Sequence, residues 1–295
     1  MSREQKQCAD LSNSGCPRES PNSRLQVACS DQEAVSRTSA QEAPTRASTL
    51  KFRHRFRERR LEGDVNMGIV ELKSPEGSVQ GYIAVPKKGH GPGVLVLHAW
   101  WGLNGFFKGL CDRLATAGFV SFAPDLYGGA TASTRDGAKA LMSKLSEKAA
   151  SEEIVRSVKA LQVHPGVRGK RPGVIGFSLG AFWALWLAQE LPADLAAVVL
   201  FYGTREGNYE RGFAATKAAF LGHFAEKDEF ESPASVQELE KLLRTNGRDV
   251  TFYTYPGTSH WFVEEDRSDA YDPRAAELAW QRTIQFLTTQ LSGRA

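Results

Sequence analysis

The sequence predicts an α/β protein whose mostly parallel sheet is covered by helices on both faces. After Met67, short apolar runs alternate with segments of helical periodicity. The run 93–98 is continuously apolar, which is typical of a strand buried on both faces of a parallel sheet. Residues 179–191 are apolar on nearly every face, as in a helix that packs against such a sheet. We therefore expect a single domain over residues 67–295.

Residues 1–66 have a different composition and predict a disordered, polar and basic tail. Up to about residue 49 they are rich in Ser, Gln, Glu, Thr and Arg, with few aromatic residues and no periodicity. The basic run 51–60 could contact RNA or an acidic partner, although a solvated linker is the favoured interpretation. The three tail cysteines are widely spaced, with no histidine among them, which predicts neither a disulfide framework nor a zinc site. Translation from Met67 stays an open alternative.

Charge is balanced in the predicted domain. Residues 1–66 hold 12 Lys and Arg and 9 Asp and Glu, which leaves 25 of each from the totals of 37 and 34. A neutral domain makes nucleic acid an improbable partner. No apolar run is long enough to cross a bilayer, and the N-terminus lacks the apolar stretch of a secretory signal peptide. We expect a cytoplasmic protein without a membrane partner.

Turn residues and β-type apolar runs place the strands. The turn at residues 74–77 separates the first two, and Pro124 with Asp125 ends the fourth. The expected strands cover residues 69–72, 82–85, 93–98, 119–122, 172–177, 196–202, 219–223 and 250–255.

Caps and apolar spacing place the helices. Ser151, followed by two glutamates, is typical of a helix N-terminus, so the helical region 135–163 is open to being two helices. Proline after a capping residue opens the last two helices. The expected helices lie at residues 107–117, 135–163 and 179–191, and from 232 and 272 onward. The last carries an apolar stripe that should face the sheet, formed by Trp280, Ile284, Leu287 and Leu291.

Residues 176–180, Gly-Phe-Ser-Leu-Gly, match G-x-S-x-G, the turn that presents the nucleophile in the α/β-hydrolase fold. A predicted strand runs into the motif and a predicted helix runs out of it, as that turn requires. The glycines on either side avoid a Cβ clash with the neighbouring strand and helix. Ser178 is the predicted nucleophile, and its alternative role is a plain helix cap.

A serine hydroxyl needs an adjacent base, and histidine suits neutral pH. His260, just past the final strand, is the only one of six histidines that follows both the motif and a suitable acid. Serine, acid and histidine in that chain order are what this fold requires. Four of the other histidines are assigned as follows: His54 to the tail, His90 to a turn, His164 to a helix end and His223 to the core.

The acid should follow the strand that precedes the base strand. Asp228 is favoured over Glu226, with Glu229 third, and a solvated acidic turn is the alternative for all three. A carboxylate at this place would hold the imidazole in the required tautomer.

An oxyanion needs two backbone N–H groups. Leu179 is expected to supply one, and either Ala99 or Trp100, on the loop after the strand 93–98, is expected to supply the other. Aromatic residues at strand ends are expected to form a substrate-binding mouth, with core packing as an equally weighted alternative: Trp100, Trp101, Tyr202 and Trp261.

Together these segments resemble the dienelactone hydrolase family over residues 67–291. The resemblance rests on residues 98–104 (HAWWGLN), 123–127 (APDLY), 176–180 (GFSLG), Asp228 and 257–262 (GTSHWF). It implies hydrolysis of an enol lactone or small ester through a covalent acyl-enzyme, without a metal or organic cofactor.

Three positions depart from that resemblance. Serine stands at position 178, where the family usually has cysteine, although other members also have serine. A glutamate that controls the thiol would fall at Ala99, and an arginine that binds the substrate carboxylate would fall near Glu264. A neutral or less acidic ester is therefore the expected substrate.

The expected function is that of a serine hydrolase of a small ester or lactone, acting as a monomer or homodimer. Acyl transfer or peptide cleavage is a second enzymatic hypothesis within the same fold. A catalytically inactive hydrolase fold that binds a ligand or partner is the hypothesis from a different class.

Overall fold

The computed structural model describes residues 66–204 and 212–292, in which the strands form one sheet. All but the last residue of the predicted tail, including the basic run 51–60, lies outside the described residues. The sheet has eight strands in the order β1-β2-β4-β3-β5-β6-β7-β8. Their bounds are β1 Asn66–Ser74, β2 Gly77–Val85, β3 Gly91–Leu97, β4 Val120–Pro124, β5 Val167–Phe177, β6 Ala197–Phe201, β7 Ala219–Lys227 and β8 Val250–Ser259.

The sheet is mostly parallel. β1 and β2 form an antiparallel hairpin, and β2 pairs antiparallel with β4. Every other neighbouring pair, from β4 through β3 and β5 to β8, is parallel. Parallel strands need crossover connections, and helices supply those from β3 to β4, β4 to β5, β5 to β6 and β7 to β8.

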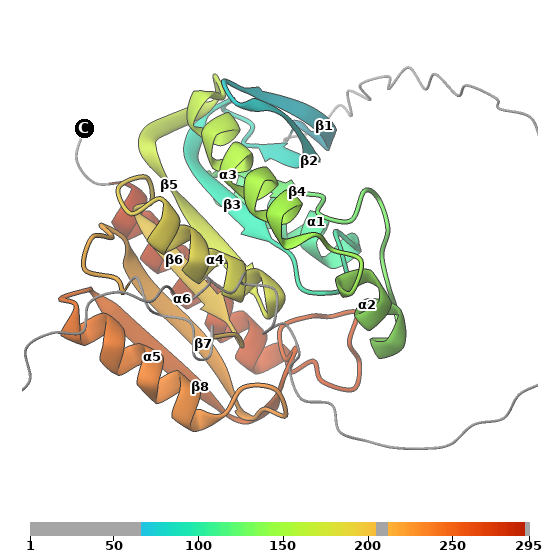
Figure 1. The fold of residues 1–295 in the computed structure, drawn as a ribbon, viewed down its shortest axis with the longest axis vertical. Helices are drawn as coiled ribbons and strands as arrows, with labels where there is room; N and C mark the ends of the chain where they lie inside the picture. The colour runs from blue at the N-terminus through green and yellow to red at the C-terminus, as the bar shows by residue number, and fades with distance from the viewer. Residues whose placement is uncertain (1–65, 205–211, 293–295) are drawn as a thin grey trace, which may run out of the picture. The chain divides into compact units, whose positions relative to one another are not determined.

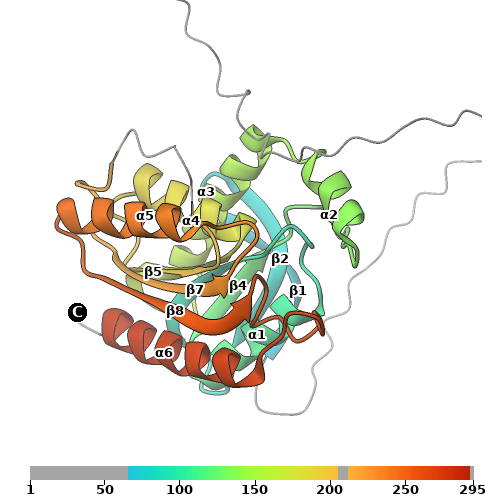
Figure 2. The same ribbon diagram turned by 90° about the horizontal axis from the view of Figure 1, so that it is seen from below.

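Helices lie on both faces of the sheet (Figures 1 and 2). Figure 2 shows α3, α4 and α5 on one face and α1 and α6 on the other. Their bounds are α1 Gly105–Thr116, α2 Arg135–Met142, α3 Glu147–Val163, α4 Leu179–Glu190, α5 Pro233–Thr245 and α6 Pro273–Leu291. The predicted layered α/β architecture is thus confirmed.

Each face of the sheet has its own apolar core. Ile154, Trp183 and Leu239 bring α3, α4 and α5 into one core, where each is at most 3% exposed. Phe107 and Leu287 bring α1 and α6 into the other. In α6, Leu287 of the predicted stripe is buried, and its other three members are partly buried against the same core. Burying such side chains contributes about 1.5–3 kcal/mol each.

The strand order reverses direction next to β3. The chain goes from β3 to β4 on one side and then returns to place β5 on the other side of β3. Loops that leave β3 and β5 therefore diverge, and ligands of open α/β sheets bind at the carboxyl ends of the strands at such a switch point. Ser178 follows β5 and Ala99 closely follows β3, so both lie at this place.

Strands extend beyond the runs that the apolar pattern predicts. β5 begins at Val167 instead of residue 172, because residues 168–171 are exposed and polar and give no apolar signal. β7 continues through Glu226 and Lys227, which are exposed as well. The predicted end of β7 at residue 223 was therefore too early.

The region 135–163 is two helices, but the second begins earlier than the predicted cap. Ser146 is the N-cap of α3 and accepts a hydrogen bond from the N–H of Ala149 at 3.3 Å. Ser151 lies inside the helix, where its hydroxyl donates to the carbonyl of Lys148 at 2.8 Å. The prediction that Ser151 caps the second helix was therefore wrong.

Within the described ranges, no helix is both long and apolar enough to span a bilayer. The same residues contain no cluster of three or more His, Cys, Asp or Glu side chains with the placement of a metal site.

Replacing Ser146 by alanine removes the cap of α3. We expect Ser146→Ala to lower the free energy of unfolding by about 1 kcal/mol, because the first turn loses a hydrogen-bond acceptor. Ser151→Ala, the matched control, should change it by less than about 0.5 kcal/mol. Urea denaturation of both variants measures the difference. A larger loss from Ser151→Ala would contradict the placement of the cap.

Candidate active site

Ser178 lies on a sharp turn between β5 and α4. Its backbone has φ 50° and ψ −111°, a conformation that L residues rarely adopt. A Cβ at position 176 would lie 2.2 Å from the carbonyl oxygen of Gly180, and a Cβ at position 180 would lie 2.1 Å from that of Leu97. Only glycine fits at either place, so the two glycines of the motif are required by this turn. The turn leaves the Ser178 residue half-buried at the carboxyl end of the sheet.

Three side chains that are far apart in the sequence meet at this turn. The Nε2 atom of His260 lies 3.0 Å from the Oγ atom of Ser178. The Nδ1 atom of His260 lies 2.8 Å from both carboxylate oxygens of Asp228. The side chains of His260 and Asp228 are 3% and 2% exposed. Nδ1 facing a carboxylate carries the proton, which leaves Nε2 free to accept the proton of the serine hydroxyl.

The acid alternatives are engaged elsewhere. Asp228 is the first residue after β7, and its Oδ1 atom also accepts from the N–H of Phe230 and of Glu231 at 2.9 and 3.1 Å. Glu226 lies in β7 and accepts from the N–H of Gly257 at 2.8 Å. Glu229 forms a bidentate ion pair with Arg135. Of these carboxylates, Asp228 is the one that is hydrogen-bonded to His260.

His223, predicted to be a core histidine, is buried beneath this site. Its Nδ1 atom lies 2.8 Å from the hydroxyl of Tyr255, and its Nε2 atom lies 3.0 Å from that of Thr283. The Tyr255 hydroxyl also accepts from Arg282 at 3.2 Å. Burial lowers the pKa of His223 to about 3, and the charge of Arg282 adds to the shift.

Two further histidines lie away from Ser178. His90 is exposed in the turn before β3, and His164 caps the C-terminus of α3, where its Nδ1 atom accepts from Gly166 at 3.1 Å. His54 lies outside the described residues.

The loop after β3 is held by a histidine that the sequence pattern did not single out. His98 is 1% exposed, and burial lowers its pKa, so the ring is neutral. Its Nδ1 atom lies 2.7 Å from the carbonyl oxygen of Ala99, which also accepts from Gly102 at 3.2 Å. A trans peptide points its N–H opposite to its carbonyl, so the N–H of Trp100 faces away from His98. Which of the two predicted donors, Ala99 or Trp100, serves the oxyanion stays a prediction.

The expected aromatic mouth is mostly a packed cluster around the histidine. Tyr202, Trp101 and Trp261 are 0%, 2% and 3% exposed, so they belong to the core, and Trp100 is half-buried. The ring centroids of Tyr202 and Trp261 lie 4.8 and 5.0 Å from that of His260. Packing these rings against one another is favourable because it removes their large apolar surfaces from water. The core-packing alternative thus describes three of the four rings, and contact of any of the four with substrate stays a prediction.

Phe230 and Arg135 line the surface of this cluster. The ring of Phe230, 39% exposed, lies 4.8 Å from that of His260. The guanidinium of Arg135 lies over the Trp261 and Phe230 rings, at 4.9 and 5.6 Å from their centroids. The signal for Phe230 was its position two residues after the predicted acid. Arg135, at the start of α2, gave no signal, because only the folded chain brings it here.

Comparison with known proteins decides the family. The model of the dienelactone hydrolase family matches residues 79–291. The chain belongs to the dienelactone hydrolase family. The "Putative carboxymethylenebutenolidase" of Aquifex aeolicus is 36% identical over 230 residues, covering 76% of this chain and 98% of that protein. The "Probable 2-oxo-3-(5-oxofuran-2-ylidene)propanoate lactonase" of a Bradyrhizobium species is 29% identical over 242 residues, covering 78% of this chain and 97% of that protein.

A solved structure confirms the fold of this dienelactone hydrolase family member. The "Putative Dienelactone Hydrolase" of Klebsiella pneumoniae superposes with a TM-score of 0.67 at 23% identity, covering 79% of this chain and 100% of that one. At that identity the likeness shows the fold alone. The chain therefore has the α/β-hydrolase fold, and its family is one of hydrolases that act on small substrates.

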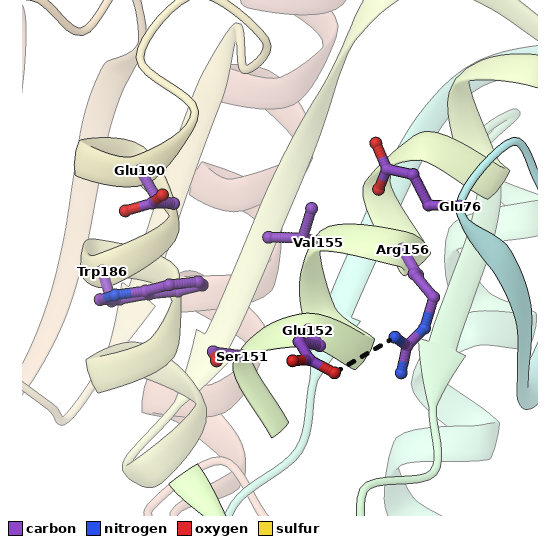
Figure 3. Close-up of a pocket in the computed structure, with 7 residues that line it drawn as sticks. All are labelled: Glu76, Ser151, Glu152, Val155, Arg156, Trp186 and Glu190. Atoms are coloured by element: carbon purple, nitrogen blue, oxygen red, sulfur yellow. Dashed lines mark ion pairs between the residues drawn. The ribbon is translucent and has the colours of Figure 1, made fainter. Parts of the chain in front are cut away.

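Two cavities lie outside the Ser178 cluster. One, of about 340 Å³, lies between α3 and α4, and no histidine or cysteine lines it (Figure 3). Three carboxylates line it, those of Glu76, Glu152 and Glu190, and Glu152 pairs with Arg156 at 3.7 Å. The other, of about 300 Å³, lies between α1 and α6 and includes Phe177 and Val263. Neither cavity is lined by Ser178, His260 or Asp228.

The low pKa of His223 predicts a loss of stability in acid. The unfolded chain takes up a proton near pH 6.5, whereas folded His223 stays neutral down to about pH 3. The contribution of His223 to the free energy of unfolding is thus fully present above pH 6.5. Below that pH it falls by about 1.4 kcal/mol per pH unit. Buried His98 contributes in the same direction.

We expect His223→Gln to reduce this slope between pH 6.5 and 4.5, and His90→Gln, at an exposed site, to leave it unchanged. Denaturant titrations at several pH values measure both slopes. A wild-type slope in His223→Gln would contradict the assignment.

Proposed function

We propose that this chain is a serine hydrolase that cleaves a small ester or lactone through a covalent acyl-enzyme. Ser178 is the nucleophile, His260 the general base and Asp228 the carboxylate that orients the base. The observation that carries the proposal is the continuous hydrogen-bonded chain from Oγ to Nε2 at 3.0 Å and from Nδ1 to the carboxylate at 2.8 Å. Relatives named carboxymethylenebutenolidase and lactonase support the same class of reaction.

In the first half of the reaction the Ser178 oxygen attacks the acyl carbon, and its proton passes to the Nε2 atom of His260. Asp228 stabilises the resulting imidazolium. The N–H group of Leu179, with that of Ala99 or Trp100, would bind the oxyanion of the tetrahedral intermediate, and α4 begins at Leu179. Collapse of the intermediate breaks the bond to the alkoxy oxygen, which takes the proton from His260. With a lactone, the released hydroxyl stays attached to the acyl group.

In the second half a water molecule attacks the acyl-enzyme. His260 accepts a proton from that water, a second tetrahedral intermediate forms, and its collapse returns the proton to the Ser178 oxygen. The products are a carboxylic acid and an alcohol, or a hydroxy acid from a lactone. Every proton transferred passes through one imidazole nitrogen, so none of these steps needs a metal.

Charge around the site favours a neutral substrate. Arg135, the guanidinium over the Phe230 ring, is already paired with Glu229. Glu264, where the family resemblance would place an arginine, is a fully buried carboxyl. The apolar faces of Trp100 and Phe230 instead suit a small apolar or unsaturated acyl group.

The inactive-fold hypothesis predicts different chemistry. Its motivation is the absence of the family residues at positions 99 and 264. A fluorophosphonate probe distinguishes the two, because only an activated serine forms the adduct. Labelling at Ser178 supports the hydrolase, and an unlabelled, folded chain supports the binding protein. Faster turnover of an amide, or transfer to an added amine, would instead support peptide cleavage or acyl transfer.

Ser178→Ala deletes the attacking oxygen. We expect p-nitrophenyl acetate hydrolysis to fall by at least about 10⁴-fold, with the circular dichroism spectrum unchanged. Ser143→Ala, at an exposed serine after α2, should keep wild-type turnover. Retained turnover in Ser178→Ala would rule out Ser178 as the nucleophile.

Asp228→Asn should leave the fold intact and lower kcat by about 10⁴-fold, because an amide stabilises the wrong imidazole tautomer. Glu226→Gln should stay within about threefold of wild type, since Glu226 bonds to the N–H of Gly257 rather than to His260. Steady-state kinetics of the pair tests the assignment. A greater loss in Glu226→Gln would transfer the role of the acid to Glu226.

A further inference from the structure

A buried carboxyl that the proposed mechanism does not use lies next to the candidate triad. Glu264 is 0% exposed and follows His260 by four residues. The hydroxyl of Tyr202, also 0% exposed, donates to its Oε1 atom at 2.7 Å. The turn fixes the Glu264 backbone as well: its N–H donates to the carbonyl of Trp261 at 2.8 Å, and its carbonyl accepts from Arg267 at 2.9 Å. Burying a carboxyl costs free energy of desolvation, so its presence here needs an explanation.

Tyr202 connects this carboxyl to both the base and the nucleophile. Its ring centroid lies 4.8 Å from that of His260, with the planes at 59°. It directly follows β6, and its backbone has a φ of 36°, in the left-handed region. Its N–H donates to the carbonyl of His223 at 2.8 Å, and the carbonyl of Phe201 accepts from the N–H of Ser178 at 2.9 Å. Hydrogen bonds thus hold Tyr202 both at its strained backbone and at its hydroxyl.

We propose that Glu264 is a positioning residue for the general base, because it holds the Tyr202 hydroxyl and thereby fixes the Tyr202 ring against the imidazole of His260. The inference rests on the proposed function, in which the imidazole must stay aligned between the serine and the acid through two proton transfers. A ring that fills one side of the imidazole restricts its rotation without donating a hydrogen bond to it.

The charge state of Glu264 follows from its surroundings. Burial raises its pKa to about 8, the hydrogen bond from Tyr202 and the charge of Arg267 lower it, and the charge of Asp266 raises it. The indole of Trp101 also faces the carboxyl and lowers its pKa. On the other side of the pair, burial and the charges of Glu264, Asp266 and Asp228 raise the pKa of Tyr202. Both raised pKa values favour the protonated carboxyl and the phenol at neutral pH, which limits the negative charge beside the imidazole.

This arrangement predicts an alkaline limit on activity. Above about pH 8 the folded protein would have to hold a carboxylate at Glu264, which has no solvent contact. Ionisation favours a rearrangement that hydrates the carboxylate, and that rearrangement releases the Tyr202 ring. We expect kcat to fall above that pH in the wild-type protein.

The decisive comparison uses Glu264→Gln, Glu264→Leu and Tyr202→Phe in the full-length chain. Glutamine keeps a carbonyl that accepts from Tyr202 but cannot ionise, so kcat at pH 7 should stay within about threefold of wild type and the alkaline inflection should vanish. Leucine and phenylalanine each remove the hydrogen bond, so both should lose about tenfold or more in kcat, with KM within about twofold. The double variant should be no worse than either single one. Glu265→Gln, at an exposed neighbour, should match wild type throughout.

A second measurement reports on packing independently of turnover. The NMR signals of the His260 ring protons should shift in Tyr202→Phe and Glu264→Leu and stay in place in Glu264→Gln, because the ring current of residue 202 moves only when its anchor is lost. Turnover retained by Ser178→Ala would overturn the proposed function, and the NMR shifts would still test the positioning. Wild-type kcat and His260 signals in Tyr202→Phe, or an alkaline inflection that persists in Glu264→Gln, would overturn the inference. So would variants with a lowered melting temperature and unchanged kcat, which would leave Glu264 a purely structural role.

Discussion

The close approach of the first turn of α4 to the end of β3 is the constraint on which the rest of this site depends. Gly180 lies against the carbonyl of Leu97, and Gly176 lies against the carbonyl of Gly180, with no room for a Cβ at either place. Because the helix starts so close to the sheet, the chain must turn at Ser178 through a backbone conformation that is costly for serine. The cost is offset by the buried helix that follows, most of whose residues pack between strands and neighbouring helices.

The parallel sheet converts this local constraint into a candidate active site. Ser178 follows β5, Asp228 follows β7 and His260 follows β8, so three segments separated by 50 and 32 positions reach the same edge. The sheet fixes the point at which each strand ends, so short loops are enough to bring the three side chains together. Beyond the hydrogen-bonded chain, the aromatic rings of Tyr202, Phe230 and Trp261 surround the imidazole and keep it in a largely dry environment, where electrostatic interactions are stronger.

Residues with a strong local signature could be predicted from the sequence. The motif around Ser178 and the chain order that singles out His260 both follow from rules of this fold, and the alternation of strands and helices gave the layers. The sequence favoured Asp228 over Glu226 but left both open, because three acids lie within four residues. The end of β7, which the apolar pattern placed too early, decides which one follows the strand.

Features that depend on tertiary packing could not be predicted from the sequence. Trp101 and Tyr202 at strand ends look the same in sequence whether they face substrate or the core, and the structure buries them. Arg135 reaches the site only because α2 folds back over it, and Glu264 looks like a surface acid until its turn is placed inside the cluster.

In the proposed mechanism, catalysis passes through an ester on the Ser178 oxygen. This intermediate can be trapped by rapid quenching during turnover of a slowly deacylated ester and located by mass spectrometry of the peptides. We expect an acyl group on the peptide that contains Ser178, at near one equivalent before the steady state, and its absence in His260→Ala. Turnover of that ester with no acyl group on Ser178, or with the acyl group on another residue, would contradict this mechanism.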